Sequence, residues 1–440
     1  MNKVFRFLGL GALAVTFTAV GATGTFAQDV CADSEIPAKT AKYEEFTKNY
    51  AGATSGERKV ALNAAKSYVE KYGSCPTDKD QIAYFNTYIP DAEKQLAIMV
   101  KDEAEEVLRK QKQPFYDRFN TGLKSKNWDE VYASGKELLK LETDPTNLLD
   151  LTIVMGQIGL DEMTEKKNNK YNADTVQYAQ LAIQKIESGT ASTNYGVAVP
   201  GSNYAFKTKK FPDSKANALG WLNYTIGYIK FNGDKNEKDA LPYLYKATQY
   251  NSGVKDLPNI YQGIGSYFFG ELEKLEAKRV AALKANNGVE NEEAKATYAL
   301  QKGYAERAFD AYAKSYNLVP SDPKQKPYKD GLYETLKNIY LFRNNGKKDG
   351  LDAAISSVKS KPLVNPTTEV TPIIETAPTP APTTNTTGTT KPETATTTPV
   401  TTKPATTTAA KPATPATPAK TTTATKAPAK KPAPKKKGTR

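Results

Sequence analysis

Helical periodicity runs through almost the whole middle of this 440-residue chain. Between residues 35 and 360, apolar side chains recur at positions i, i+3 or i+4 and i+7, while alternating β-branched residues are scarce. This spacing places the apolar side chains on one face of each helix, where a neighbouring helix can cover them. The sequence therefore predicts an all-α fold of consecutive helices that pack as antiparallel neighbours.

Glycine and proline residues divide this region into its expected helices. The breaks fall at Gly73, Pro90, Pro114, Pro145, Gly189, Gly253, Pro320 and Gly346. Because proline lacks the backbone N–H that a helix interior needs, we expect three separate helices over residues 78–89, 91–112 and 114–125. A single helix is expected over residues 146–161.

The first 27 residues have the pattern of a cleaved signal peptide. Lys3 and Arg6 precede an apolar run over residues 8–21, and the small residues Thr25 and Ala27 favour cleavage before Gln28. The alternative is a membrane anchor, but the run is shorter than the ~18–20 residues that span a bilayer. We therefore expect export, to a periplasm or to the outside of the cell.

Residues 361–440 differ in composition from the rest of the chain. They contain no aromatic residue, and their eleven Lys and one Arg against three Glu give this segment +9 of the chain's total charge of +13. Such a Thr-, Pro-, Ala- and Lys-rich segment is expected to be a disordered tail.

The end of this tail carries a cluster of lysines that we expect to contact a polyanion, such as an acidic surface polymer. The candidate residues are Lys430, Lys431, Lys435, Lys436 and Lys437. The alternatives are that the charges only solvate the tail, that the tail is a semi-rigid spacer, or that its Thr/Pro stretch is an O-glycosylated stalk. Because the basic charge is concentrated here, it gives no reason to expect a nucleic-acid-binding fold.

The absence of histidine limits the chemistry that the chain can carry out. It excludes the Ser–His and Cys–His nucleophile pairs and most zinc sites. The sequence also has no glycine-rich phosphate loop and no GxSxG motif. We expect no cofactor, no metal and no catalytic residue.

Cys31 and Cys75 are the only cysteines. An even pair of cysteines in an exported chain predicts a disulfide. In the chain-entropy model, closing this loop would stabilise the folded state by roughly 4 kcal/mol. The alternative, two free thiols or a redox pair, lacks the CxxC spacing.

Four stretches of the helical region resemble the tetratricopeptide-repeat family, whose repeat pairs a first helix with a second. The stretches ERAFDAYAKSYNLVP and KDALPYLYKATQY have the small-to-large spacing of second helices, and YQGIGSYFF and WLNYTIGY have that of first helices. The residues that carry the resemblance are Ala308, Tyr312, Ser315 and Pro320; Ala240, Leu244 and Ala247; Tyr261, Ile264, Gly265 and Phe268; and Trp221, Tyr224, Thr225 and Tyr228. The resemblance implies a right-handed solenoid of antiparallel helix pairs over residues 28–360; the alternative is an irregular helical bundle.

Two segments depart from a compact repeat. A repeat would place Ala308 closer to Tyr261, and the extra residues between them are strongly helical on both sides of a turn at Asn286 to Gly288. We expect residues 270–304 to form a projecting helical arm. Residues 188–212 form a non-helical insertion, which Tyr195, Tyr204 and Phe206 would dock against the stack.

The resemblance also implies a function, because tetratricopeptide proteins bind peptides or other proteins in a groove formed by first helices. The groups of YQGIGSYFF that packing does not use are Asn259, Gln262, Ser266 and Phe269, which we nominate as groove contacts. We expect an exported, non-enzymatic scaffold that binds a protein or peptide partner. The alternatives are an envelope glycan hydrolase with a carboxylate pair and a surface-binding protein whose tail is the functional part.

Overall fold

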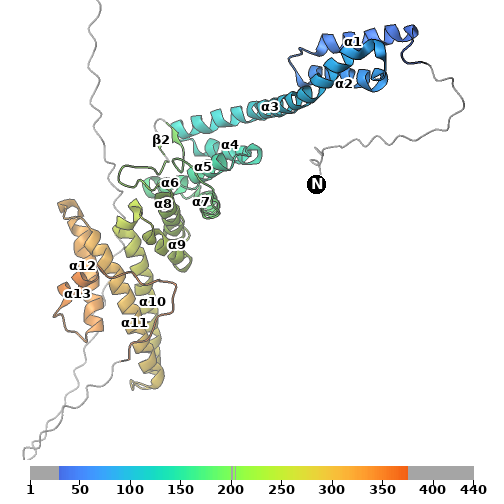
Figure 1. Cartoon of the computed structure of the whole chain (residues 1–440). Helices are drawn as coiled ribbons and strands as arrows, with labels where there is room; N and C mark the ends of the chain where they lie inside the picture. Colours follow the sequence, from blue (N-terminus) through green and yellow to red (C-terminus); the bar gives the residue numbers. More distant parts are fainter. Residues whose placement is uncertain (1–28, 200–201, 204, 375–440) are drawn as a thin grey trace, which may run out of the picture. The chain divides into compact units, whose positions relative to one another are not determined.

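The computed structural model describes residues 29–374 apart from 200–201 and 204, and the statements below refer to these residues. Helices make up nearly all of their regular structure. The two strands in this part of the chain, β1 (Ala198–Val199) and β2 (Ser202–Asn203), form a small antiparallel pair. The predicted all-α class is confirmed (Figure 1).

The chain divides into two compact units between Gln113 and Pro114. This differs from the single domain that we expected over residues 28–360. The division falls within a long helix, α3 (Lys79–Ser125), just after a stretch in which most side chains are exposed to solvent. Because few side chains are buried in that stretch, it contributes little to a common hydrophobic core.

The N-terminal unit is built from α1 (Ile36–Asn49), α2 (Ser55–Tyr72), two short 3₁₀ turns (Asp33–Glu35 and Pro76–Asp78) and the first part of α3. Thr54 begins α2 with a capping box, in which its side chain and that of Glu57 satisfy each other's backbone N–H groups. The core of this unit is rich in aromatic residues and contains Phe46, Ala61, Ala65, Tyr68, Tyr72 and Phe85.

The helix α3 continues through Pro90 and Pro114, so the three separate helices expected over residues 78–125 are wrong. Contacts from α2 to residues beyond Pro90 stabilise the continuation. Lys66 forms an ion pair with Glu93, and the Ser55 backbone N–H donates to the Glu103 carboxylate at 2.7 Å. These contacts help to offset the helix penalty of proline at Pro90. After Pro114, the α3 residues Phe119 and Leu123 are buried in the core of the C-terminal unit, which holds the helix there.

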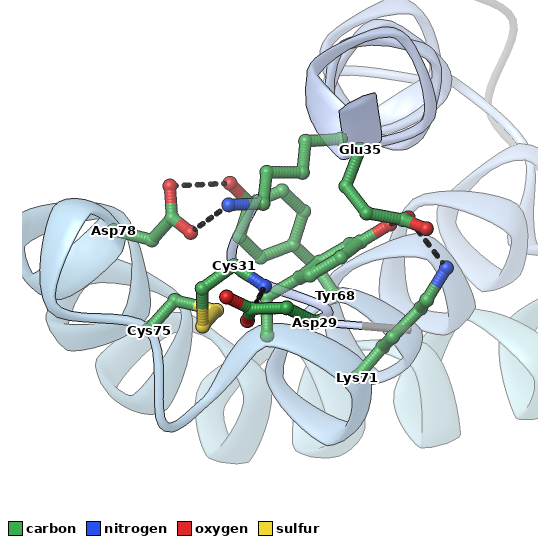
Figure 2. A network of polar contacts seen from close by, with 9 residues as sticks. Asp29, Cys31, Glu35, Tyr68, Lys71, Cys75 and Asp78 are labelled. Carbon is green, nitrogen blue, oxygen red and sulfur yellow. Dashed lines mark hydrogen bonds and ion pairs between the residues drawn. A yellow bond between two sulfur atoms is a disulfide. The ribbon is translucent and has the colours of Figure 1, made fainter. Parts of the chain in front are cut away.

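The predicted disulfide between Cys31 and Cys75 is confirmed, with a Cα–Cα distance of 5.3 Å (Figure 2). It links the segment before α1 to the end of α2. Two carboxylates lie near it: Glu35 accepts from Lys71 at 2.7 Å and from Tyr72 at 3.0 Å, and Asp78 accepts from Lys39 at 2.6 Å. The hydrogen bonds from Lys71 and Tyr72 lower the pKa of Glu35 below its ordinary value.

The C-terminal unit is a succession of helices in which each member from α7 to α12 packs against the next along the chain. The helices after α3 are α4 (Trp128–Leu141), α5 (Pro145–Met155), α6 (Ile158–Lys166), α7 (Asn172–Glu187), α8 (Ser214–Tyr228), α9 (Glu237–Gln249), α10 (Pro258–Ala285), α11 (Glu292–Leu318), α12 (Lys326–Arg343) and α13 (Leu351–Ser357). One helix was expected over residues 146–161, but α5 ends before Gly156 and α6 follows. A π-helical turn, Ile229–Gly233, extends α8.

Most of the residues that carry the tetratricopeptide resemblance are buried, although Trp221 and Tyr228 are only partly buried and Pro320 is exposed. Ala308, Ala240 and Ile264 are fully buried, and Tyr312 and Phe268 are nearly so. A Cβ atom on Gly265 of α10 would lie only 2.9 Å from the ring of Tyr312 on α11, so that ring occupies the space that the glycine leaves.

Two further segments were singled out in the sequence, residues 270–304 and residues 188–212. Residues 270–304 include the ends of α10 and α11 that lead to their connecting turn, and these long helices lie side by side (Figure 1). Residues 188–212 contain no helix, and Tyr195 and Phe206 pack into the core with α7 and α8. Tyr204 lies outside the described residues.

We predict that replacing Glu35 with Gln destabilises the N-terminal unit at neutral pH but not in acid. Because the folded-state pKa of Glu35 is lowered, its contribution is present above the ordinary pKa and is lost as pH falls through the lowered value. Hydrogen exchange of α1 amides should therefore differ between wild type and E35Q at neutral pH and converge as the pH falls through the lowered pKa of Glu35. The control is E44Q, because Glu44 has no ion pair within the described chain; a constant difference for E35Q would contradict the prediction.

Candidate functional site

Residues 361–374, here called the strap, run along α11 without helix or strand and with a turn at Pro366 and Thr367. The strap begins at an ion pair of 2.6 Å between Lys361 and the mostly buried Asp310. It then passes Arg307 and Gly303, and the Ile373 backbone N–H donates to the Ala299 carbonyl at 2.9 Å. The strap therefore runs antiparallel to α11.

Arg307 and Gly303 hold the middle of the strap. The Arg307 guanidinium donates to the Asn365 carbonyl and to the Thr368 hydroxyl, each at 3.1 Å. At Gly303 a Cβ atom would lie 2.3 Å from the Thr371 carbonyl oxygen, so only glycine permits this close approach. Beside it, the side chain of Val370 is 7% exposed.

The strap corrects the expected boundary of the tail. A disordered segment was expected to start at residue 361, but residues 361–374 contact the folded unit through buried side chains and backbone hydrogen bonds. The reason is that Leu363 and Val370 bury apolar surface against the core of the C-terminal unit, which the average composition of the tail conceals.

A cleft between α9, α10, α11 and the strap, here called the strap cleft, has a volume of about 630 Å³. Ligand pockets are typically of this size. Its lining includes aromatic and apolar side chains (Tyr243, Tyr267, Phe268, Tyr304, Leu241, Pro242, Leu300), charged side chains (Lys230, Lys238, Asp239, Glu369), and the strap residues Pro366, Thr367, Thr368 and Val370.

The chemistry of the strap cleft is mixed. Lys230 and Lys238 have no ion-pair partner within the described chain, and they are therefore available to a ligand. Burial raises the pKa of Tyr267 and of Tyr304, so both phenols are neutral donors at physiological pH. The cleft can therefore stack apolar rings of a ligand and donate hydrogen bonds to its carbonyl or hydroxyl oxygens.

A second groove continues from the strap cleft along the arm, and the two share Lys238 and Tyr267. It has a volume of about 940 Å³ and lies between the start of α9 and the middle of α10. Its remaining lining residues are Lys235, Asn236, Glu237, Gly270, Glu271, Glu273, Lys274 and Ala277. An extended ligand in the strap cleft would have a path onto the arm.

The four nominated groove residues lie elsewhere on α10, and none lines either cleft. Three of them pair with tyrosine hydroxyls of neighbouring helices. Asn259 donates to Tyr224 at 2.6 Å, Gln262 accepts from Tyr328 at 2.9 Å, and Ser266 shares a hydrogen bond of 3.0 Å with Tyr312.

Phe269 is partly buried against the core. These four residues therefore support packing between helices, and a ligand contact at any of them stays a prediction.

The nominated tail lysines, Lys430, Lys431, Lys435, Lys436 and Lys437, lie outside the described residues. Within residues 29–374, apart from the three undescribed positions, no group of His, Cys, Asp and Glu side chains could hold a metal ion. No helix of the described chain combines the length and apolar character needed to cross a membrane.

In comparisons with known proteins, no protein-family model, no curated protein and no solved structure matches this chain. We therefore infer a function from the geometry of the strap, its cleft and the surrounding helices.

We predict that Gly303→Ala releases the strap from α11, because the new methyl group would collide with the Thr371 carbonyl. Hydrogen exchange at residues 370–374 should rise severalfold while that of α11 stays protected. The matched control is Gly331→Ala in α12, where a Cβ atom meets nothing within 4 Å. Unchanged strap protection in G303A would contradict the proposed anchoring.

Proposed function

We propose that this chain is an exported, non-enzymatic binding protein that holds an extended polypeptide segment in the strap cleft. In this proposal, helices α8 to α12 form a tetratricopeptide-like stack, and the basic tail contacts anionic polymers of the envelope. The main support is the strap, which is itself a peptide segment without helix or strand that lies along the same surface.

The strap supports the proposal through the kind of contacts that it makes. Arg307 contacts backbone carbonyls and a hydroxyl group, and Gly303 accommodates backbone; neither contact depends on a particular large side chain. Main-chain contacts of this kind bind extended peptides of many sequences. Neighbouring pockets then give specificity, because they bind every second side chain of the peptide. The tyrosines and the two lysines of the strap cleft supply such pockets.

The helical context also supports a binding role. Consecutive packing from α7 to α12 is compatible with a helical-repeat fold, and such folds present extended surfaces to ligands. The confirmed disulfide is compatible with a chain that functions in an oxidising compartment.

We predict that a photo-crosslinking residue in place of Lys238 captures a polypeptide partner from the cell envelope. Lys238 lines both clefts and is exposed, so the substitution leaves the core intact. The matched control carries the same residue in place of Lys324, which is exposed in the turn before α12 and lines neither cleft.

The partner segment, identified by mass spectrometry, should bind wild type as a synthetic peptide and bind Y267A/Y304A about tenfold more weakly, as expected for aromatic hot spots. Equal capture from both positions, or unchanged affinity in the double variant, would contradict the proposal.

The second candidate function is hydrolysis of an envelope glycan. It is favoured by one observation: the carboxylates of Asp239 and Glu369 line the same cleft as Tyr243, Tyr267 and Tyr304. Two carboxylates flanked by aromatic rings are the usual machinery of glycosidases.

If this candidate is correct, D239N and E369Q should each abolish release of reducing sugars from envelope polysaccharide, while E273Q in the adjoining groove should not. Release of no sugar by wild type, or full activity in both variants, would eliminate it.

A further inference from the structure

The N-terminal unit carries a surface cluster of four tyrosines, here called the tyrosine patch, that the proposed function does not use. Tyr43 and Tyr50 lie on α1, and Tyr84 and Tyr88 lie on α3; all four rings lie within 6.4 Å, centroid to centroid, of the buried Phe46. Tyr43 is 41% exposed, Tyr50 43% and Tyr84 47%. Exposed aromatic clusters of this kind mark interaction sites more often than isolated surface rings do.

The polar groups of the patch point to a ligand that accepts hydrogen bonds. The Tyr88 hydroxyl is buried among the exposed rings and has no hydrogen-bond partner in the described chain. Buried hydroxyls without a partner are rare in folded proteins. The nearby Arg58 is already engaged, because its guanidinium donates to the Gly52 carbonyl at 2.8 Å and to the Tyr50 carbonyl. The groups of the patch that a ligand can contact are therefore mainly phenol hydroxyls and ring faces, and not the Arg58 guanidinium.

Acidic residues flank the patch. Glu44 and Glu45 follow Tyr43 on α1, and Asp80 lies one turn before Tyr84 on α3. All three are exposed and have no ion pair in the described part of the chain. Some other carboxylates of the same unit are paired, as Glu35 is with Lys71, and others, such as Glu70 and Asp102, have no ion pair within the described residues. Lys48 on α1 and Lys79 on α3 are also exposed without an ion pair in the described residues, so the surface has mixed charge. Its carboxylates can contact positive charge on a ligand whose apolar groups lie on the rings.

Proline-rich, lysine-containing segments have the required chemistry. They favour the polyproline II conformation, which leaves the backbone carbonyls free to accept hydrogen bonds. Because the free segment already has this conformation, it loses less conformational entropy on binding. Aromatic grooves elsewhere recognise such segments by stacking on the proline rings. Residues 411–437 of this chain contain six prolines and eight lysines. The geometry points to the tyrosine patch as a docking site for residues 411–437 of the chain's own tail.

The exposed area favours a short segment over a folded partner. A tyrosine buries about 150–250 Å² in full, so the three exposed rings present roughly 200–350 Å² together. A stable interface between two folded proteins needs about 800 Å² from each partner. The patch is therefore too small for a stable dimer of folded units, and it is large enough for a few residues of extended chain.

Photo-crosslinking in the purified full chain tests this inference. A photoreactive residue in place of Thr87, which is exposed on α3 between Tyr84 and Tyr88, should label residues 411–437. The matched control places the same residue at Ile98, which is on the same helix and 59% exposed. We expect the label from position 87 to exceed that from position 98 about tenfold, as for a contact of ~1.4 kcal/mol.

Two variants of the labelled chain separate the causes. Tyr43→Ala with Tyr84→Ala should remove the crosslink, and so should alanine at the six prolines of residues 411–437 with every lysine retained. Circular dichroism checks that both variants remain folded. The inference is overturned by equal labelling from positions 87 and 98, by a crosslink that survives the proline substitutions, or by a crosslink to the folded part of a second copy.

Discussion

The packing of Tyr312 against Gly265 fixes the pair of long helices on which the C-terminal unit depends. A residue with a Cβ atom at position 265 would separate α10 from α11, because that atom would fall within 3 Å of the tyrosine ring. With the two helices in close contact, α9 packs on one side of the pair and α12 on the other. This contact positions α10, and residues of α10 line both the strap cleft and the second groove that continues from it.

Tyrosine serves different purposes in the two units. In the C-terminal unit, Tyr224, Tyr312 and Tyr328 are largely buried, and their hydroxyls pair with polar side chains of α10. Burial raises the pKa of Tyr312 to about 12, so its phenol stays a neutral hydrogen-bonding group. In the N-terminal unit, Tyr43 and Tyr84 leave much of their rings in solvent. Tyr68 and Tyr72 of the same unit are buried, so tyrosine there fills the core as well as presenting a surface.

The sequence predicted most of the helices and the disulfide, because apolar spacing and an even cysteine pair are local signals. It failed at Pro90 and Pro114, where contacts made from other parts of the chain outweigh a local helix penalty. It also assigned Val370 and Ile373 to a disordered tail, because the composition of residues 361–440 was averaged over the whole segment. The short apolar run in EVTPII could have separated the strap from the tail.

The candidate site was harder to predict than the fold. Asn259, Gln262 and Ser266 were selected because packing did not require them, yet each found a tyrosine partner on another helix. Helical periodicity identifies which face of a helix is polar, but it does not show which polar groups are already paired. The strap cleft depends on a segment outside any helix, so no periodic signal pointed to it.

The direction of the strap determines how it would respond to a mechanical load. Its contacts follow one another along α11 from Asp310 to Ala299, a distance of about 16 Å at 1.5 Å per residue. A pull on the chain beyond Ile374, directed along α11, would load the ion pair, the Arg307 contacts and the Ile373 hydrogen bond together in shear. Force applied to the tail would therefore be borne by the side of α11, and the small final helix α13 would be shielded from it.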